Sequence, residues 1–128
     1  MNKKEKLLLL TDLSPRLPYR TKGIITYDKS NTTFTVEGID NNILHLSDAE
    51  ECYVEDFKPY LRPMSSMTTD ERYYYRQLQR YSTFYTEITH YDTYESIDWL
   101  NKHHFDYRGL IRKGLALRAP EGMYEKAW

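Results

Sequence analysis

Apolar side chains recur at helical spacing close to the start of the chain: Leu7, Leu10 and Leu13. Side chains three or four positions apart share one face of a helix, so the pattern predicts a short helix from about Lys3 to Leu13. Pro15 and Pro18 follow this segment. Because proline lacks an N–H donor and fixes φ, the helix is expected to end there, and the chain to continue in an extended form through Arg16–Tyr19.

The pattern changes to strand-like runs between residues 22 and 46. β-branched and aromatic residues gather in three runs: Ile24–Tyr27, Thr33–Val36 and Ile43–Leu46. The polar segments between them, Asp28–Thr32 and Gly38–Asn42, are typical of turns. A fourth short strand is expected near Cys52–Val54. The prediction is a small antiparallel meander of three or four strands, followed by an extended connector over residues 56–63, where prolines recur.

Helical spacing returns in the second half of the chain. Thr68 and Glu71 fit a capping box, in which each side chain caps the backbone N–H of the other, and this predicts the start of a helix. The helix is expected from about Thr69 to Thr89, because five apolar side chains step by four and three along one face: Tyr74, Leu78, Tyr81, Tyr85 and Ile88. A second helix is expected to end at about His104, and a third, short one to cover Tyr107–Lys113.

Together these elements predict an α+β fold, with an N-terminal helix, the small meander and then two or three C-terminal helices. A sheet of this size needs a cover over its apolar face, and the helices on either side in the sequence are available to provide it. The chain has 128 residues, the usual length of one domain. We therefore expect a single domain over 1–128, β-rich at about 20–62, helical at about 68–114 and irregular over 115–128.

Composition and charge narrow the classes of function. The chain has 18 Lys and Arg residues against 19 Asp and Glu, a formal net charge of −1. With charges this evenly balanced, the protein has no overall positive electrostatic field that would attract it to nucleic acid or to an anionic membrane. No apolar run approaches the ~20 residues of a membrane helix, so no membrane partner is expected. Cys52 is the single cysteine, which excludes an internal disulfide and favours a cytoplasmic location.

Three segments of the chain have distinctive sequences: Leu10–Tyr19 (LTDLSPRLPY), Lys58–Thr68 (KPYLRPMSSMT) and Asp98–Ile111 (DWLNKHHFDYRGLI), the last continuing to Gly122–Tyr124 (GMY). Together they resemble short uncharacterised proteins of Bacteroides-type bacteria, their prophages and their phages. The resemblance covers a little under half of the chain and leaves out Arg72–Tyr91. It implies an accessory protein of bacterial or phage origin in the cytoplasm. Because that family carries no assigned activity, cofactor or catalytic residue, the resemblance implies no site.

No catalytic residue, cofactor or metal site is predicted, and we do not expect an enzyme. The densest group of catalytic residue types is His103, His104 and Asp106. Adjacent helical residues diverge by about 100°, so the two histidines do not converge on one metal ion. A partly buried, hydrogen-bonded His104 is the favoured interpretation. A single cysteine, Cys52, is weak evidence for a nucleophile.

A stripe of arginines is the candidate nucleic-acid interface. Arg72, Arg76 and Arg80 fall opposite the apolar face of the helix predicted over residues 69–89, interleaved with Tyr73 and Tyr75. Arginine binds phosphates and tyrosine stacks on unpaired bases, so the stripe suits nucleic acid. The other interpretation is a solvated helix face. The near-zero net charge favours the latter, which makes nucleic-acid binding the second hypothesis.

Trp99 is predicted on the far side of its helix from the apolar face, with His103 one turn later. A tryptophan there is either covered by another element, such as the tail with Tyr124 and Trp128, or exposed as an anchor for a partner. The favoured hypothesis is a non-enzymatic, tyrosine-rich accessory protein that binds another protein or self-associates. Trp99 and His103 are its candidate contacts, and the Tyr74–Ile88 face is another surface for self-association.

Overall fold

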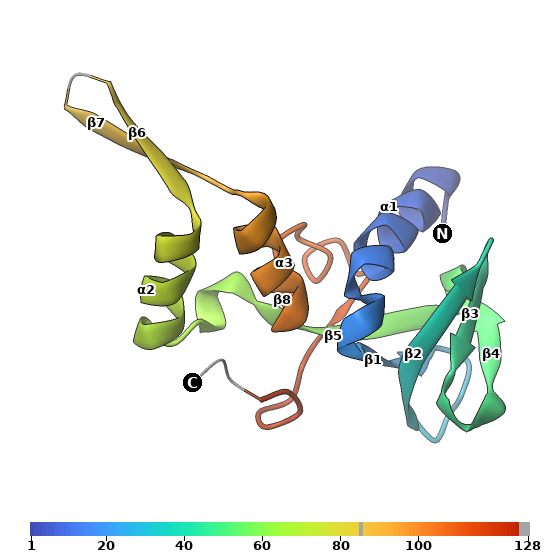
Figure 1. Ribbon diagram of the computed structural model, residues 1–128. Coiled ribbons are helices and arrows are strands. Elements are labelled where there is room, and N and C mark those ends of the chain that lie inside the picture. Colours follow the sequence, from blue (N-terminus) through green and yellow to red (C-terminus); the bar gives the residue numbers. More distant parts are fainter. Residues whose placement is uncertain (85, 126–128) are drawn as a thin grey trace.

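The computed structural model describes residues 1–84 and 86–125 and shows an α+β fold with a long mixed sheet (Figure 1). Its α-helices are α1 (Lys3–Leu13), α2 (Thr69–Leu78) and α3 (Tyr94–Lys102). The strands of the main sheet are β1 (Lys22–Ile25), β2 (Thr33–Asp40), β3 (Ile43–Leu46), β4 (Glu51–Tyr53), β5 (Phe57–Pro63), β8 (Phe105–Asp106) and β9 (Leu117–Arg118). A separate pair consists of β6 (Arg80–Phe84) and β7 (Glu87–Tyr91). Within these described residues, no helix has the length and apolar character needed to cross a membrane.

The sheet is larger than the sequence predicts. Seven strands take part, in the order β4-β3-β2-β1-β5-β8, with β9 also paired to β5. β1 to β5 pair antiparallel, whereas β8 and β9 lie parallel to β5. The predicted small meander of three or four strands with two or three C-terminal helices is therefore wrong. The segment expected to be an extended connector is instead strand β5, in which Pro59 lies opposite Gly23. Proline can occupy a strand because its backbone is extended there, although it donates no hydrogen bond.

The larger of two hydrophobic clusters lies between α1 and the sheet. It includes Leu9 and Leu13 of the helix, which has the bounds that the sequence predicts, together with Phe57 and Leu61 of β5. Gly23 makes this packing possible, since a Cβ atom there would lie 2.3 Å from the Phe57 ring and 2.5 Å from the Lys58 carbonyl oxygen. The close approach of β1 and β5 therefore requires glycine at this position.

The smaller cluster joins α2, α3 and β8. Its buried members are Met67, Tyr75, Trp99, Leu100 and Phe105. Strand β5 runs from the first cluster to the second, because Phe57 and Leu61 belong to one and its next residue, Arg62, lies over the Phe105 ring of the other at 4.1 Å. The expectation of one domain over 1–128 stays a prediction.

The helical part of the chain also differs from the prediction. Helix α2 begins at its predicted capping box, but it ends at Leu78, and the residues expected to extend it to Thr89 form the hairpin of β6 and β7. Those residues are rich in threonine, tyrosine and other strand formers, so local preference prevails over the helical spacing. The third helix expected at Tyr107–Lys113 is a series of turns, and the tail contains β9. Tyr85 lies outside the described residues.

Candidate functional site

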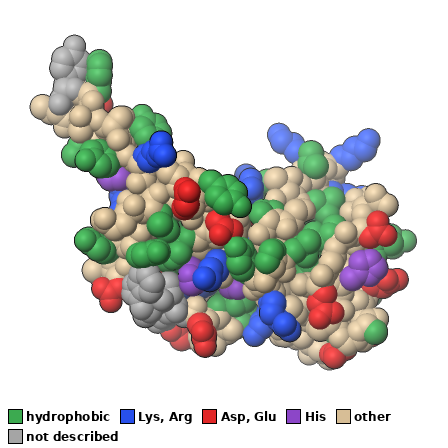
Figure 2. Space-filling model, in the orientation of Figure 1, with side chains coloured by type: hydrophobic (Ala, Val, Ile, Leu, Met, Phe, Trp, Pro, Cys, Tyr) green, Lys and Arg blue, Asp and Glu red, His purple; other side chains and the backbone are tan. Residues whose placement is uncertain are grey.

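The hairpin of β6 and β7, called the arm here, projects from the body of the molecule beside α2 (Figure 1). All ten residues of its two strands are exposed. They include large apolar side chains, and Phe84 is 71% exposed and Ile88 63%. Figure 2 shows hydrophobic side chains along the arm, away from the body. Exposed apolar surface of this kind typically marks a binding site.

Both edges of the arm are open. Among the described strands, β6 and β7 pair only with each other. An isolated two-stranded hairpin is marginally stable in water, and an unpaired edge offers backbone N–H and C=O groups to another chain. The arm is therefore suited to gain stability from a partner.

Cross-strand pairs place different side chains on the two faces of the arm. Residues directly opposite each other share a face. Tyr81 and His90 form one such pair, with ring centroids 6.4 Å apart, and Thr83 lies opposite Ile88 on the same face. The other face carries the pairs Arg80–Tyr91, Ser82–Thr89 and Phe84–Glu87. Both faces thus combine apolar rings or chains with hydroxyl groups.

A hydrogen-bond network fixes the base of the arm. The Tyr75 hydroxyl donates to the Asp92 carboxylate, and Gln79 Nε2 donates to Asp92 Oδ1 at 3.0 Å. Ser96 Oγ also donates to this oxygen, at 3.1 Å, and Thr93 Oγ1 donates to the Leu78 carbonyl at 2.7 Å. Burial and then the Asp92 hydrogen bond raise the pKa of Tyr75. The end of α2 and the start of α3 are therefore clamped together where the arm leaves the body.

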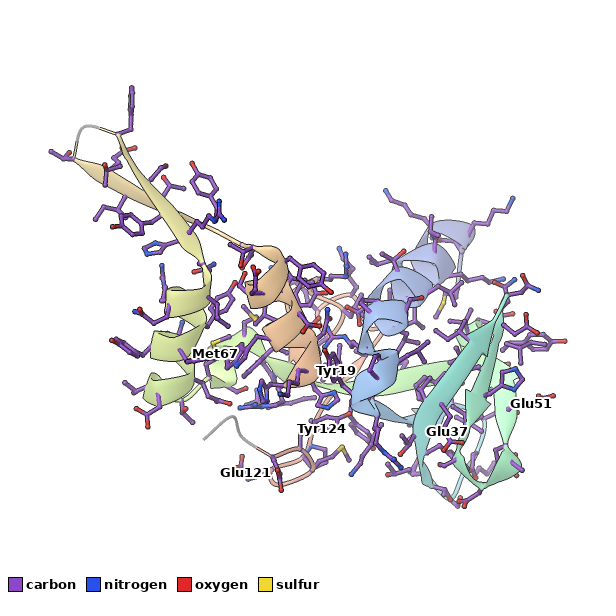
Figure 3. All side chains as sticks on the ribbon, viewed as in Figure 1. Tyr19, Glu37, Glu51, Met67, Glu121 and Tyr124 are labelled. Carbon is purple, nitrogen blue, oxygen red and sulfur yellow. The ribbon has the colours of Figure 1, made fainter. Side chains whose placement is uncertain are left out.

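A groove of about 660 Å³ lies between the arm and α2. It is lined by Met64, Ser65, Met67, Arg72, Tyr75, Arg76, Gln79, Ile88, Thr89 and His90. These residues combine apolar side chains with two arginines, and the set contains no Asp or Glu. Figure 3 labels Met67 next to α2. The groove is open, mixed in polarity and positive in charge.

The structure separates the residues of the predicted nucleic-acid stripe. Arg72 and Arg76 are exposed on α2 and line the groove, whereas Arg80 lies on β6 because the helix ends two residues earlier. Tyr73 is 69% exposed, but Tyr75 is buried and its hydroxyl is bonded to Asp92. The stripe is therefore not continuous, and one of its two tyrosines has no free face for a base.

Trp99, the predicted protein contact, is 7% exposed. It is covered within the chain by the rings of four residues: Tyr74, Tyr75, His103 and Phe105. His103 is half-buried, and burial followed by the charge of Lys102 lowers its pKa. Of the tail residues considered as a cover, Trp128 lies outside the described residues. Trp99 therefore belongs to the second hydrophobic cluster and has little exposed surface to offer a partner.

The arm is not among the elements that the sequence pattern predicts. Its two strands, Arg80–Phe84 and Glu87–Tyr91, contain seven β-branched, aromatic or hydroxyl side chains: Tyr81, Ser82, Thr83, Phe84, Ile88, Thr89 and Tyr91. Pairs of such runs separated by two residues are a known hairpin signal. Neither separating residue, Tyr85 or Thr86, is the Gly or Asn typical of a tight hairpin turn, which weakens that signal.

Polar contacts join two of the segments singled out in the sequence, Leu10–Tyr19 and Asp98–Ile111. Arg16, fully buried, donates to Asp12 at 3.0 and 3.1 Å, and its Nη2 donates to the Phe105 carbonyl at 2.7 Å. Arg108 Nε lies 3.3 Å from the same Asp12 carboxylate. Tyr19, labelled in Figure 3, donates to Asp98 at 2.7 Å. These bonds connect α1 and its following 3-10 turn, η1 (Ser14–Tyr19), with α3 and β8.

The same region contains a buried histidine. His104 stacks on Tyr124 with ring centroids 3.8 Å apart, and burial followed by the charge of Arg16 lowers the pKa of His104 to about 3. The Tyr124 hydroxyl accepts from Lys22 N at 2.8 Å and donates to the Tyr60 carbonyl at 2.9 Å. Since these groups are bonded within the chain, the region functions as a structural connection between the two hydrophobic clusters.

The remaining candidates for chemistry are isolated. The described residues contain no group of three His, Cys, Asp or Glu side chains placed to hold a metal ion. Cys52 is buried, and burial followed by the charge of Asp56 raises the pKa of its thiol to about 11. A thiol with this pKa is a weak nucleophile at neutral pH.

Comparison with known protein families, curated proteins and solved structures finds no match to this chain. The features of the structure that indicate a function are therefore the exposed arm and the groove beside it.

Proposed function

We propose that the chain is a non-enzymatic protein-binding module and that the arm is its binding element. The observation that carries the proposal is the exposure of the arm. Every residue of its two strands is exposed, and these residues include large apolar side chains. Fully burying a side chain such as Phe or Ile contributes roughly 1.5–3 kcal/mol. A partner that covers Phe84 and Ile88 would therefore gain several kcal/mol from two residues alone.

The proposed setting is the bacterial cytoplasm, which is supported by the single cysteine and by the resemblance of three segments. The partner is another protein or a second copy of this chain. Nucleic-acid binding has less support, because Arg80 lies on β6 and not on the helix that carries Arg72 and Arg76, and because Tyr75 is buried.

A displayed library of random peptides, together with light scattering, tests this proposal without a known partner. The test variant carries Phe84→Ser and Ile88→Ser, and the control carries Leu7→Ser, which removes an apolar side chain of similar exposure, 66%, from α1. We expect the wild type and the control to enrich peptides or to self-associate, and the arm variant to lose this binding. Equal enrichment by the arm variant, or binding by none of the three proteins, would refute the proposal.

A further inference from the structure

The groove beside the arm has the free edge of a strand as one wall. Three consecutive residues of β7, Ile88–His90, line it. Because consecutive side chains of a strand point to opposite faces, a wall that includes all three is formed by the edge of the strand. β7 pairs with β6 on its other side and with no further described strand. The N–H and C=O groups of this edge are thus open to the groove.

The opposite wall is positive. Arg72 and Arg76 extend from α2, and neither forms an ion pair with a described residue. One carboxylate, Asp92, contacts the lining residues Tyr75 and Gln79, where it is held by the hydrogen bonds at the base of the arm. The arginine charges are therefore available to an acidic ligand.

The spacing of the arginines suits an extended peptide. Residues four apart on a helix are separated by about 6 Å along its axis. Alternate residues of a strand, which point to the same side, are separated by roughly 6.6 Å. A strand that runs along α2 can therefore place two acidic side chains at alternate positions on Arg72 and Arg76 together. The side chains between them would point away from the arginines, and the apolar residues Met64 and Met67 line the same groove.

We propose that the groove takes an acidic, extended segment of a partner protein, which adds to the edge of β7 as a third strand. This inference rests on the proposed function and names the chemistry of the partner. Its backbone would be recognised by hydrogen bonds to β7, and its alternate acidic side chains by Arg72 and Arg76. β7 has five residues, so a segment of about five or six residues matches its length.

Fluorescence anisotropy with three defined probes tests this proposal: an octapeptide alternating Glu and Val, the same peptide with Lys in place of Glu, and oligothymidylate. We expect the Glu peptide to bind best. Arg72→Gln with Arg76→Gln should weaken its binding by about two- to thirty-fold, the range for losing two exposed ion pairs. The control pair Arg112→Gln and Lys113→Gln, also exposed but outside the groove, should leave binding unchanged.

Backbone N-methylation of the peptide tests whether it adds to β7 as a strand, because a methylated amide cannot donate a hydrogen bond. The Glu peptide is N-methylated at alternate amides in one of the two possible phases, and only the phase that faces β7 should abolish binding. Three results would each overturn the inference: the Lys peptide binds as well as the Glu peptide, oligothymidylate binds best, or both phases of methylation are tolerated. If any of these occurs while Phe84→Ser with Ile88→Ser still abolishes peptide enrichment, the inference fails and the proposed function stands.

Discussion

Asp12 provides the sharpest test of how the fold is held together. Its buried carboxylate accepts two hydrogen bonds from Arg16 and lies 3.3 Å from Arg108, and the Arg16 side chain is also fully buried. Asp12→Asn keeps the size of the side chain but removes the negative charge. Arg16 would then hold an uncompensated buried charge, which typically costs about 3–5 kcal/mol. Because small domains have a total stability of roughly 5–15 kcal/mol, this loss is a large fraction of the whole.

Urea unfolding followed by circular dichroism measures this loss as a lower midpoint. The matched control is Glu51→Gln, which removes a carboxylate whose pairing with His45 at 3.5 Å is exposed to solvent; Figure 3 labels Glu51 on β4. Exposed pairs contribute about 0–1 kcal/mol, so this variant should be close to the wild type. Equal destabilisation by the two substitutions, or a loss below about 1 kcal/mol for Asp12→Asn, would refute the reasoning.

Two further predictions concern stability. Gly23→Ala should destabilise the fold by about 1–3 kcal/mol, because the added Cβ atom meets the Phe57 ring and the Lys58 carbonyl, and a urea midpoint equal to that of the wild type would contradict this. The lowered pKa of His104, about 3, means that the unfolded chain binds a proton below pH ~6.5 that the folded chain does not, so stability should fall as the pH decreases from about 6.5 to 3. His104→Asn, which suits the positive φ there, should reduce this slope in unfolding curves measured across that range, and an unchanged slope would argue against it.

Local signals in the sequence predict some elements well. The spacing of Leu7, Leu10 and Leu13 places α1 at its observed bounds, and the capping box of Thr68 and Glu71 is present with both hydrogen bonds. These elements depend on residues three or four positions apart, so a short stretch of sequence contains the information that forms them. The three predicted strand runs between residues 22 and 46 also overlap β1, β2 and β3.

The arm was missed although its strand-forming residues are a local signal, whereas the other errors arise where partners distant in the sequence decide the structure. β5 has prolines at 59 and 63, and its strand character comes from pairing with β1, β8 and β9. β8 and β9 have two residues each, too few to show a periodic pattern. For the site, Trp99 lies on a helix as expected, but it packs in one cluster with Leu100 rather than on a separate far side. Its covering rings include those of α2 and β8, whose arrangement no local pattern contains.

Hydrogen exchange of the arm, measured with and without a peptide selected by the wild-type chain, tests the central claim most directly. The arm is exposed on both strands, so its amides should exchange fast in the free protein. We expect the bound peptide to slow exchange in residues 80–91, most strongly along Glu87–Tyr91, while amides of α1 stay unchanged. Protection that appears elsewhere in the chain and leaves the arm as fast as before would contradict the account.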